Sequence, residues 1–272
     1  MERMSITTLS ILLALAAGGC SGAYHLAVPD QVADAGGETT TVVRVERQEF
    51  WLIWTAVEEA AVRFQIADGQ ERAAYSDKMG YAGTTVPVPE TPGRYTMDVA
   101  YLDRDGDDVA TTTPVYVWDP ARPVLAVDLD ALPAPWSGQS SWAVRALTDA
   151  AGRYNICYMT RRELNEHQQA HEQLVRAGYP DGPVLLWQRQ RWHLVEGWKG
   201  IPRVVVESRM VSELPELGKR FDRLAVGLAT GPLAAEAYRQ AGMDVAVIGA
   251  ADVEGQATRY ENWTDLARRG LP

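Results

Sequence analysis

The stretch Val124-Leu125-Ala126-Val127-Asp128-Leu129-Asp130 sets the interpretation of the second half of this 272-residue sequence. Its four consecutive apolar residues predict a strand that is buried on both faces, as in a parallel sheet covered by helices. Two acids follow at positions i and i+2, which point the same way off a strand. Ligands of such sheets bind at the carboxyl ends of the strands, and a buried carboxylate is costly without a partner. Asp128 and Asp130 are therefore the first candidates for a functional site.

The residues after Val124 alternate between short apolar runs and longer helical patterns. This alternation predicts an α/β, Rossmann-like domain over residues 120–272, with a parallel sheet whose faces are both covered. Glycines 152, 178 and 242 follow predicted helices and indicate left-handed C-caps. The predicted strands are 124–127, 154–159, 184–187, 224–228 and 245–248, and the predicted helices are 140–151, 161–177, 203–217, 233–241 and 260–269.

The residues before the Pro-rich junction Asp119–Pro123 show a different pattern, with short runs of alternating apolar and polar residues separated by turns. About seven short strands predict an all-β sandwich over residues 20–119. The stretch Pro92–Val99 resembles a strand of immunoglobulin-like modules. The acidic run Asp103–Asp108 has the wrong spacing for a calcium-binding loop and favours a solvated hairpin turn. Six of these predicted strands have clear bounds, at 40–45, 50–54, 61–66, 84–88, 95–101 and 115–118.

The first twenty residues have the pattern of an export signal. Arg3 precedes a short apolar run, and two glycines lead into Cys20. The apolar run is shorter than the roughly 20 residues that span a bilayer. The segment resembles a bacterial lipoprotein signal, which implies removal of residues 1–19, lipidation of Cys20 and anchoring in the cell envelope with the membrane as a partner. The alternative is a plain signal peptide cleaved nearby.

Composition excludes two broad classes of protein. Lys+Arg 26 against Asp+Glu 36 gives a net charge of 26 − 36 = −10, so nucleic acid is not an expected partner. With 46% hydrophobic and 23% charged residues, the chain is expected to fold rather than to remain disordered.

Several motifs between residues 123 and 249 resemble the haloacid dehalogenase superfamily. Asp128 and Asp130 match its DxD signature, and Thr160 matches the Ser or Thr that ends the second strand. The runs 158–162 and 178–186 resemble the lipin-like, phosphatidate-phosphatase-like branch, and 236–242 resembles the helix after the fourth motif. The resemblance implies that Asp128 is a nucleophile and Asp130 an acid/base, that Thr160 and a basic residue, Arg203 or Lys199, hold phosphate, and that Mg²⁺ is the cofactor.

The sequence departs from this family pattern where the metal is held. The acids expected in the fourth motif fall on Thr230 and Ala234, so only Asp128 and Asp130 remain as metal ligands. Without a metal, an aspartate about 4 Å from one phosphate charge is repelled by about 4 kcal/mol at an effective dielectric constant of 20. The departures favour a degenerate phosphatase domain that binds a phosphorylated ligand, a lipid headgroup or a protein partner. The alternative is a Mg²⁺-dependent phosphatase that acts on a phosphomonoester or on phosphatidate through an aspartyl-phosphate.

Two further patterns allow more than one interpretation. His167 and His171 are spaced i, i+4, as in some zinc sites, but the sequence shows no third ligand, so a solvated helix face is expected. The segment Trp187–Trp198 interleaves aromatic residues with arginines. It is interpreted as a hairpin, with contacts to a headgroup or a glycan as the alternative.

Overall fold

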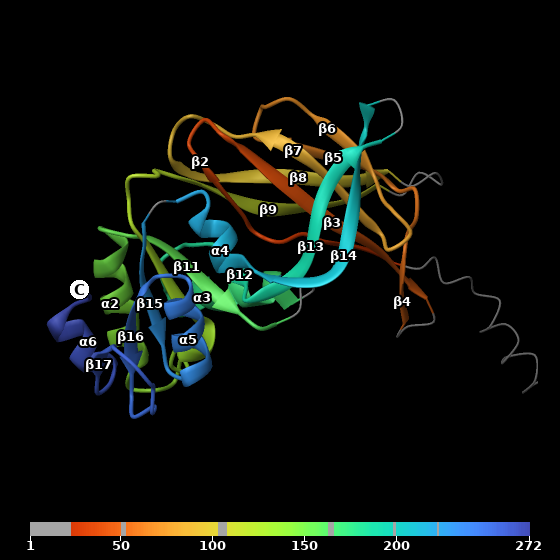
Figure 1. Cartoon of the computed structure of the whole chain (residues 1–272). Helices are drawn as coiled ribbons and strands as arrows, with labels where there is room; N and C mark the ends of the chain where they lie inside the picture. The colour runs from red at the N-terminus through yellow and green to blue at the C-terminus, as the bar shows by residue number, and fades with distance from the viewer. Residues whose placement is uncertain (1–22, 50–52, 103–107, 163–165, 198–199, 222) are drawn as a thin grey trace, which may run out of the picture.

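The computed structural model describes residues 23–49, 53–102, 108–162, 166–197, 200–221 and 223–272 (Figure 1). The export signal with Cys20, most of the acidic run 103–108, and the pair Trp198 and Lys199 lie outside these ranges. Strands make up 46% of the structure and helices 21%, so the protein is mostly β. No helix in the described ranges is long and apolar enough to cross a membrane.

The N-terminal part consists of two sheets that pack face to face. β5 alternates strictly between half-buried and buried residues, as a strand with one face on a core requires. Val43 and Val45 of one sheet share a core with Phe64 and Val99 of the other. One sheet contains β1 (Tyr24–Ala27), β3 (Glu38–Glu49), β4 (Ile53–Ala56) and β7 (Tyr81–Pro87), and the other has the order β2 (Gln31–Asp34), β9 (Asp108–Trp118), β8 (Gly93–Leu102), β5 (Ala61–Ile66) and β6 (Arg72–Tyr75).

The C-terminal part is built on a six-stranded sheet in which all neighbouring strands run parallel. Counted along the chain, the strand order is 3-2-1-4-5-6, the order of a doubly wound α/β sheet. The predicted parallel sheet is therefore confirmed. Its strands are, in spatial order, β12 (Val184–Leu186), β11 (Asn155–Thr160), β10 (Val124–Asp128), β15 (Leu224–Ala229), β16 (Asp244–Ile248) and β17 (Thr258–Tyr260).

The two faces of this sheet are covered in different ways. α2 (Ser140–Ala151), α3 (His167–Ala177) and α6 (Trp263–Arg269) pack on one face. The other face receives α5 (Pro232–Gln240) and the short α4 (Glu213–Gly218). Val32, Tyr116 and Trp118 of the N-terminal part belong to this second core, where Trp118 meets Phe221 edge to face at 5.2 Å. The N-terminal and C-terminal parts are thus joined by a continuous apolar seam.

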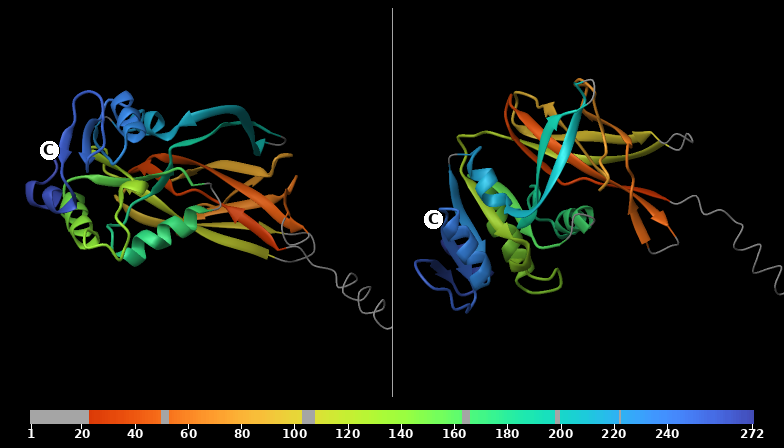
Figure 2. Two further views of the ribbon diagram at one scale, coloured as in Figure 1. Left: turned by 90° about the horizontal axis from the view of Figure 1, so that it is seen from below. Right: turned by 45° about the vertical axis from the view of Figure 1, so that its right-hand side comes forward.

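The predicted helix over residues 203–217 is wrong. The chain instead forms an antiparallel hairpin of β13 (Gln188–Glu196) and β14 (Pro202–Ser212), and only 213–218 are helical. The hairpin leaves the C-terminal part and lies along β7 and β6 of the N-terminal part (Figure 2). A methyl group at Gly83 would lie 2.8 Å from Val204, so glycine permits this close approach. β-Branched Val204–Val206 favour the strand once it has a partner.

The glycines that follow predicted helices differ in conformation. Gly178 and Gly242 have φ of 80° and 78°, as predicted for left-handed caps. Gly152 has φ of −65°, so its predicted left-handed conformation is wrong.

A buried carboxylate lies in the seam. Asp30 of the N-terminal part accepts a hydrogen bond from the Val184 backbone N–H at 2.8 Å. Its oxygens lie 3.8 Å from His167 Nδ1 and 3.5 Å from His171 Nδ1. The predicted solvated face of α3 is wrong for these histidines, because His167 is only 2% exposed and both face Asp30.

Asp181 makes a second polar contact across the same seam. It accepts a hydrogen bond from Tyr116 Oη at 2.7 Å and pairs with Arg94 at 3.3 Å. His171 Nε2 lies 3.9 Å from the same carboxylate. His171 therefore lies between two acids, one from each part of the chain.

These contacts shift two pKa values in opposite directions. Burial acts to raise the pKa of Asp30, but the imidazoles of His167 and His171 and the Val184 N–H outweigh it and hold that pKa below its usual value. Contact with Asp30 raises the pKa of His171, against the opposing effect of burial. The charged forms of both groups are thus favoured in the folded protein.

We expect these two groups to support the fold best from roughly pH 4 to pH 6.5. The contribution of Asp30 is present above its ordinary pKa of 3.8 and disappears as the pH falls through its lower folded value. The contribution of His171 is complete below 6.5 and disappears as the pH rises through its higher folded value. Urea unfolding should show that the native chain loses more stability than His171→Asn above pH 6.5. Equal losses of stability in the native chain and in His171→Asn would contradict the contribution assigned to His171.

Substitution of Gly227 tests the packing of the second core. A Cβ atom there would lie 2.1 Å from Tyr238 Cγ, and the Tyr238 side chain is fully buried. We expect Gly227→Ala to lower the free energy of unfolding by about 2 kcal/mol or more. Gly138→Ala is the matched control, because no atom lies within 4 Å of its added methyl group. Thermal unfolding that is equally affected by both changes would disprove the overlap.

Candidate functional site

The first candidate residue, Asp128, ends the central strand β10. All five residues of this strand are buried, and Asp128 is 3% exposed. Its register partner is Met159 on β11, so it lies at the carboxyl edge of the sheet as the sequence predicts. Its Oδ1 accepts a weak hydrogen bond from the Asp130 backbone N–H at 3.4 Å, which begins a 3₁₀ turn over Leu129–Ala131.

The two acids have different surroundings. Because the strand ends at Asp128, Asp130 lies in the turn and its side chain is 65% exposed, against 4% for Asp128. The expectation that strand geometry orients both acids therefore does not hold, because only Asp128 belongs to the strand. Arg161 Nη1 lies 2.9 Å from Asp130 Oδ2 and 3.7 Å from Asp128 Oδ1. A fixed positive charge thus bridges the two carboxylates.

Thr160 ends the neighbouring strand β11 and is brought to the same edge. Its hydroxyl accepts a hydrogen bond from the Arg162 backbone N–H at 3.1 Å. Its backbone carbonyl accepts one from the Trp187 backbone N–H at 2.9 Å. Its position agrees with the prediction, but its hydroxyl already accepts a hydrogen bond within the local turn.

Arg203 does not join this group. It is exposed on β14, opposite Val195, and lines a hollow with Glu58 and Asp77 at the far end of the hairpin. The prediction placed it at the first residue of the helix 203–217 in the α/β part. The hairpin that replaces this helix carries it toward the N-terminal part.

Three residues that were not among the predicted catalytic residues complete the edge, although Trp187 belongs to the aromatic segment that was predicted as a hairpin or a headgroup contact. Arg161 lies with its guanidinium 5.5 Å from the ring of Trp187, which in turn packs against Tyr238 at 5.0 Å. Among the described residues, neither the Trp187 indole N–H nor the Tyr238 hydroxyl has a hydrogen-bond partner, although both are buried. The available sequence signal was the position of these residues at strand ends: Trp187 is the last residue of the predicted strand 184–187, and Arg161 comes two residues after the predicted strand 154–159.

A crevice of about 580 Å³ opens beside these residues. Its walls come from the hairpin, α4 and α5, and most of its lining is apolar or uncharged. Among its lining residues that the structure describes, Arg161 is the one with a charge. The crevice therefore offers one cation within a largely uncharged wall.

The surroundings of Asp128 alter its acidity. Burial raises its pKa, and the nearby Asp130 adds to this effect. Arg161, the Asp130 backbone N–H and the Trp187 indole N–H act in the opposite direction but do not cancel it. The pKa of the Tyr238 hydroxyl is also raised, first by burial and then by the charge of Asp128. Protonation of Asp128 is thus easier than for an exposed aspartate.

These donors do not fit the magnesium site that the family resemblance implies. Mg²⁺ requires near-octahedral oxygen ligands, usually including carboxylates. The end of β15 and the start of α5 supply Thr230 and buried Ala234 where acids are expected. In the described ranges, no group of three or more His, Cys, Asp or Glu residues is arranged to hold a metal ion. Arg161 supplies the positive charge that a metal would bring to the two carboxylates.

Comparison with known proteins gives no family assignment. No family model and no curated protein matches the chain. The D0-D1 domain of intimin is 20% identical over 34% of this chain and 47% of that one, with a TM-score of 0.26. A purple acid phosphatase from yellow lupin seeds is 11% identical over 61% and 35%, with a TM-score of 0.32. A 2,6-sialyltransferase from a Photobacterium species is 9% identical over 81% and 41%, with a TM-score of 0.23. The chain spans less than half of each of these structures.

Removal of the bridging charge tests the arrangement of the acids. We expect Arg161→Gln to raise the pKa of Asp128 further, because the group that opposes burial is lost. Carboxyl chemical shifts followed by NMR against pH measure this pKa directly. Arg162→Gln is the control, since Arg162 contacts Gln173 and not the acids. An unchanged Asp128 titration in Arg161→Gln would show that the bridge is not formed in solution.

Proposed function

We propose that the chain is an exported, lipid-anchored protein of the bacterial cell envelope that binds a ligand without turning it over. Its N-terminal part is an immunoglobulin-like sandwich, and its C-terminal part is a haloacid-dehalogenase-like domain with a degenerate site. Cys20 carries the lipid, and the membrane is one partner. This proposal takes the export signal and the motifs of the sequence together with the geometry of the carboxyl edge.

The order of the parallel strands supports the haloacid-dehalogenase-like assignment. The strand that ends in Asp128 lies in the middle of the sheet, and the strand that ends in Thr160 is its neighbour. These are the positions that the first two motifs require, because ligands of such sheets lie at the carboxyl edge where the strand order reverses.

The bridge made by Arg161 is the single observation that carries the proposal of binding without catalysis. Its guanidinium contacts Asp130 at 2.9 Å and lies 3.7 Å from Asp128, so the charge of the acid pair is offset by the protein itself. An aspartate that is held by an arginine and has a raised pKa is a poor nucleophile for a phosphate. The nucleophile and the acid/base of the family are thus turned into a structural ion pair.

The crevice indicates the chemistry of the ligand. One arginine in an otherwise uncharged wall suits an anionic group attached to an apolar or neutral body, such as a phosphorylated small molecule or a lipid headgroup. Asp130 is exposed, so water weakens its hold on Arg161 and an anion can compete for the guanidinium. The ring of Trp187 lies next to Arg161, and its buried indole N–H acts on Asp128 by lowering the pKa of that acid.

Hydrolysis assays separate this proposal from the phosphatase alternative. The chain from Ser21 onward should not hydrolyse p-nitrophenyl phosphate or vesicle-borne phosphatidate with Mg²⁺ faster than Asp128→Asn does. Circular dichroism confirms that both proteins are folded. Turnover that Asp128→Asn abolishes would refute the degenerate site and establish a phosphatase.

Binding assays test the role of Arg161. We expect Arg161→Gln to weaken the binding of glycerol phosphate or of anionic vesicles about tenfold or more, because a hydrogen bond to a charged group contributes about 1.5 to 3 kcal/mol. Arg162→Gln should bind as the native chain does. Equal affinity of all three proteins would exclude Arg161 from the site. Binding to vesicles alone would identify a lipid headgroup.

A further inference from the structure

We propose that the cavity at the seam between the two parts, hereafter the seam cavity, binds a neutral polyhydroxylated ligand, such as a glycan of one or two sugar units. The cavity has a volume of about 370 Å³, which lies within the range of small-molecule sites. It is separate from the carboxyl edge and does not depend on the function proposed for that edge.

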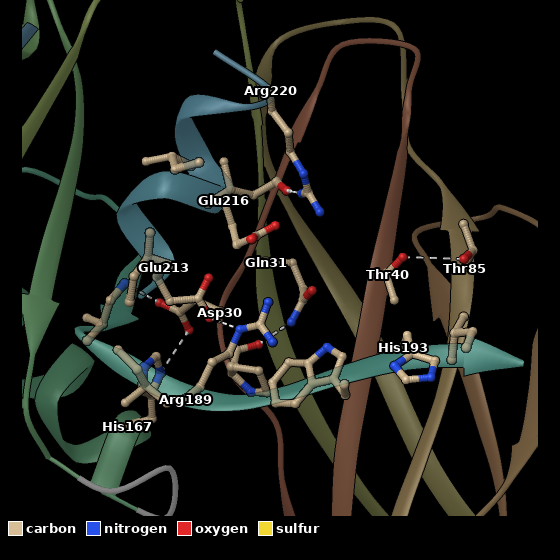
Figure 3. A pocket seen from close by; sticks show the side chains of 18 residues that line it. Asp30, Gln31, Thr40, Thr85, His167, Arg189, His193, Glu213, Glu216 and Arg220 are labelled. Carbon is tan, nitrogen blue, oxygen red and sulfur yellow. Dashed lines mark hydrogen bonds and ion pairs between the residues drawn. The ribbon is translucent and has the colours of Figure 1, made fainter. Parts of the chain in front are cut away.

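The walls of the seam cavity come from both parts of the chain (Figure 3). Gln31 on β2, Thr40 on β3 and Thr85 on β7 line it from the N-terminal sheets. The hairpin, α4 and the first residue of α3 close it from the other side. Cavities between packed units are frequent ligand sites, because neither unit fills the space alone.

His167 is the observation that points to a ligand. It lines the cavity, is 2% exposed, and neither of its ring nitrogens has a hydrogen-bond partner among the described residues. Asp30 lies 3.8 Å from Nδ1, which is too far for a hydrogen bond. Nδ1 thus has only the charge of Asp30 near it, and Nε2 has no hydrogen-bond partner among the described residues. A buried ring nitrogen without a hydrogen bond is costly, whereas a ligand hydroxyl group can donate to such a nitrogen or accept from its N–H.

The charges around the cavity argue for a neutral ligand, because each acid already has a positive partner. Glu213 is paired with Arg189, and Glu216 with Lys219 at 2.7 Å. Asp30 has His171 at 3.5 Å. An added charge would have to break one of these pairs, so recognition is left to groups that form neutral hydrogen bonds.

Arg220 also has its own partner. Its Nη1 donates to the Val32 carbonyl at 2.7 Å, and its charge lies close enough to lower the pKa of Glu213 against the dominant effect of burial. The guanidinium keeps further N–H groups that can donate to a neutral hydroxyl group, whereas an anion placed there would also meet the charge of Glu213.

The remaining lining suits a sugar ring. Trp192 is half-buried on β13, and Arg189 stacks on its ring at 4.0 Å, which holds the indole in place. An aromatic ring packs against the C–H face of a sugar, while hydroxyl and amide groups reach its edge. Thr40 and Thr85 lie 3.4 Å apart on the opposite wall and supply such hydroxyl groups. The adjacent His193 is exposed, so the cavity is open to solvent there.

Calorimetric titration tests this proposal on the full chain in a detergent without a sugar headgroup. The probes are neutral mono- and disaccharides that cover the common hexose and N-acetylhexosamine epimers, with glucuronate and glucosamine as charged counterparts. We expect saturable binding of at least one neutral probe, and at least tenfold weaker binding of its charged counterpart. Binding of no neutral probe, or equal binding of the charged one, would overturn the proposal.

Variants locate the binding. Trp192→Ala removes a half-buried ring on the hairpin, and His167→Gln removes the unpartnered imidazole. We expect each to weaken binding at least tenfold. Trp136→Ala is the matched control, because Trp136 is 88% exposed and lines a different hollow. If His167→Gln fails to fold, Trp192→Ala still tests the site. Full affinity in Trp192→Ala would place the ligand elsewhere.

Discussion

A parallel sheet has two apolar faces, and both must be covered before it is stable in water. Three helices cover one face here, whereas the other receives α5 and the six-residue α4. Val32, Tyr116 and Trp118 of the N-terminal part complete this second face. The seam is therefore part of a shared hydrophobic core and not a contact between two domains whose cores are each complete. The position of the hairpin, the buried acids and the seam cavity all follow from this shared core.

The polar groups of the seam fix how the two parts meet. Transfer of a carboxylate out of water costs several kcal/mol, so Asp30 is tolerated only where the Val184 N–H and two histidines reach it. Tyr116 and Asp181 impose a second alignment. Apolar surfaces alone would let the two parts pack in several relative positions. The polar groups of the seam can form their hydrogen bonds and ion pairs in only one of these positions. We expect these groups to act on the specificity of the arrangement more than on its total stability.

The regular elements could be predicted because their patterns are local. Strand β5 alternates with period two, and the run before Asp128 is apolar throughout, so both were found with correct or nearly correct bounds. The stretch that contains Val204 was misread as a helix. Its partner strand β13 is near in the sequence, but the surface on which this hairpin packs, at Gly83, lies far away in the sequence. Asp128 and Thr160 were placed at the correct edge. Arg161 was missed because only the three-dimensional structure brings its guanidinium between two acids.

The segment from Trp187 to Arg189, where the hairpin begins, contributes residues to both sites. The Trp187 backbone N–H donates to the Thr160 carbonyl at 2.9 Å, and the Trp187 ring packs beside Arg161 at the carboxyl edge. Two residues later, Arg189 pairs with Glu213 in the seam cavity. A ligand that orders either residue acts on the same short segment. If binding at one place changes the affinity at the other, linkage requires the effect to be equal in both directions. The hairpin that the helix prediction missed is thus the element through which the sheet edge and the seam are physically connected.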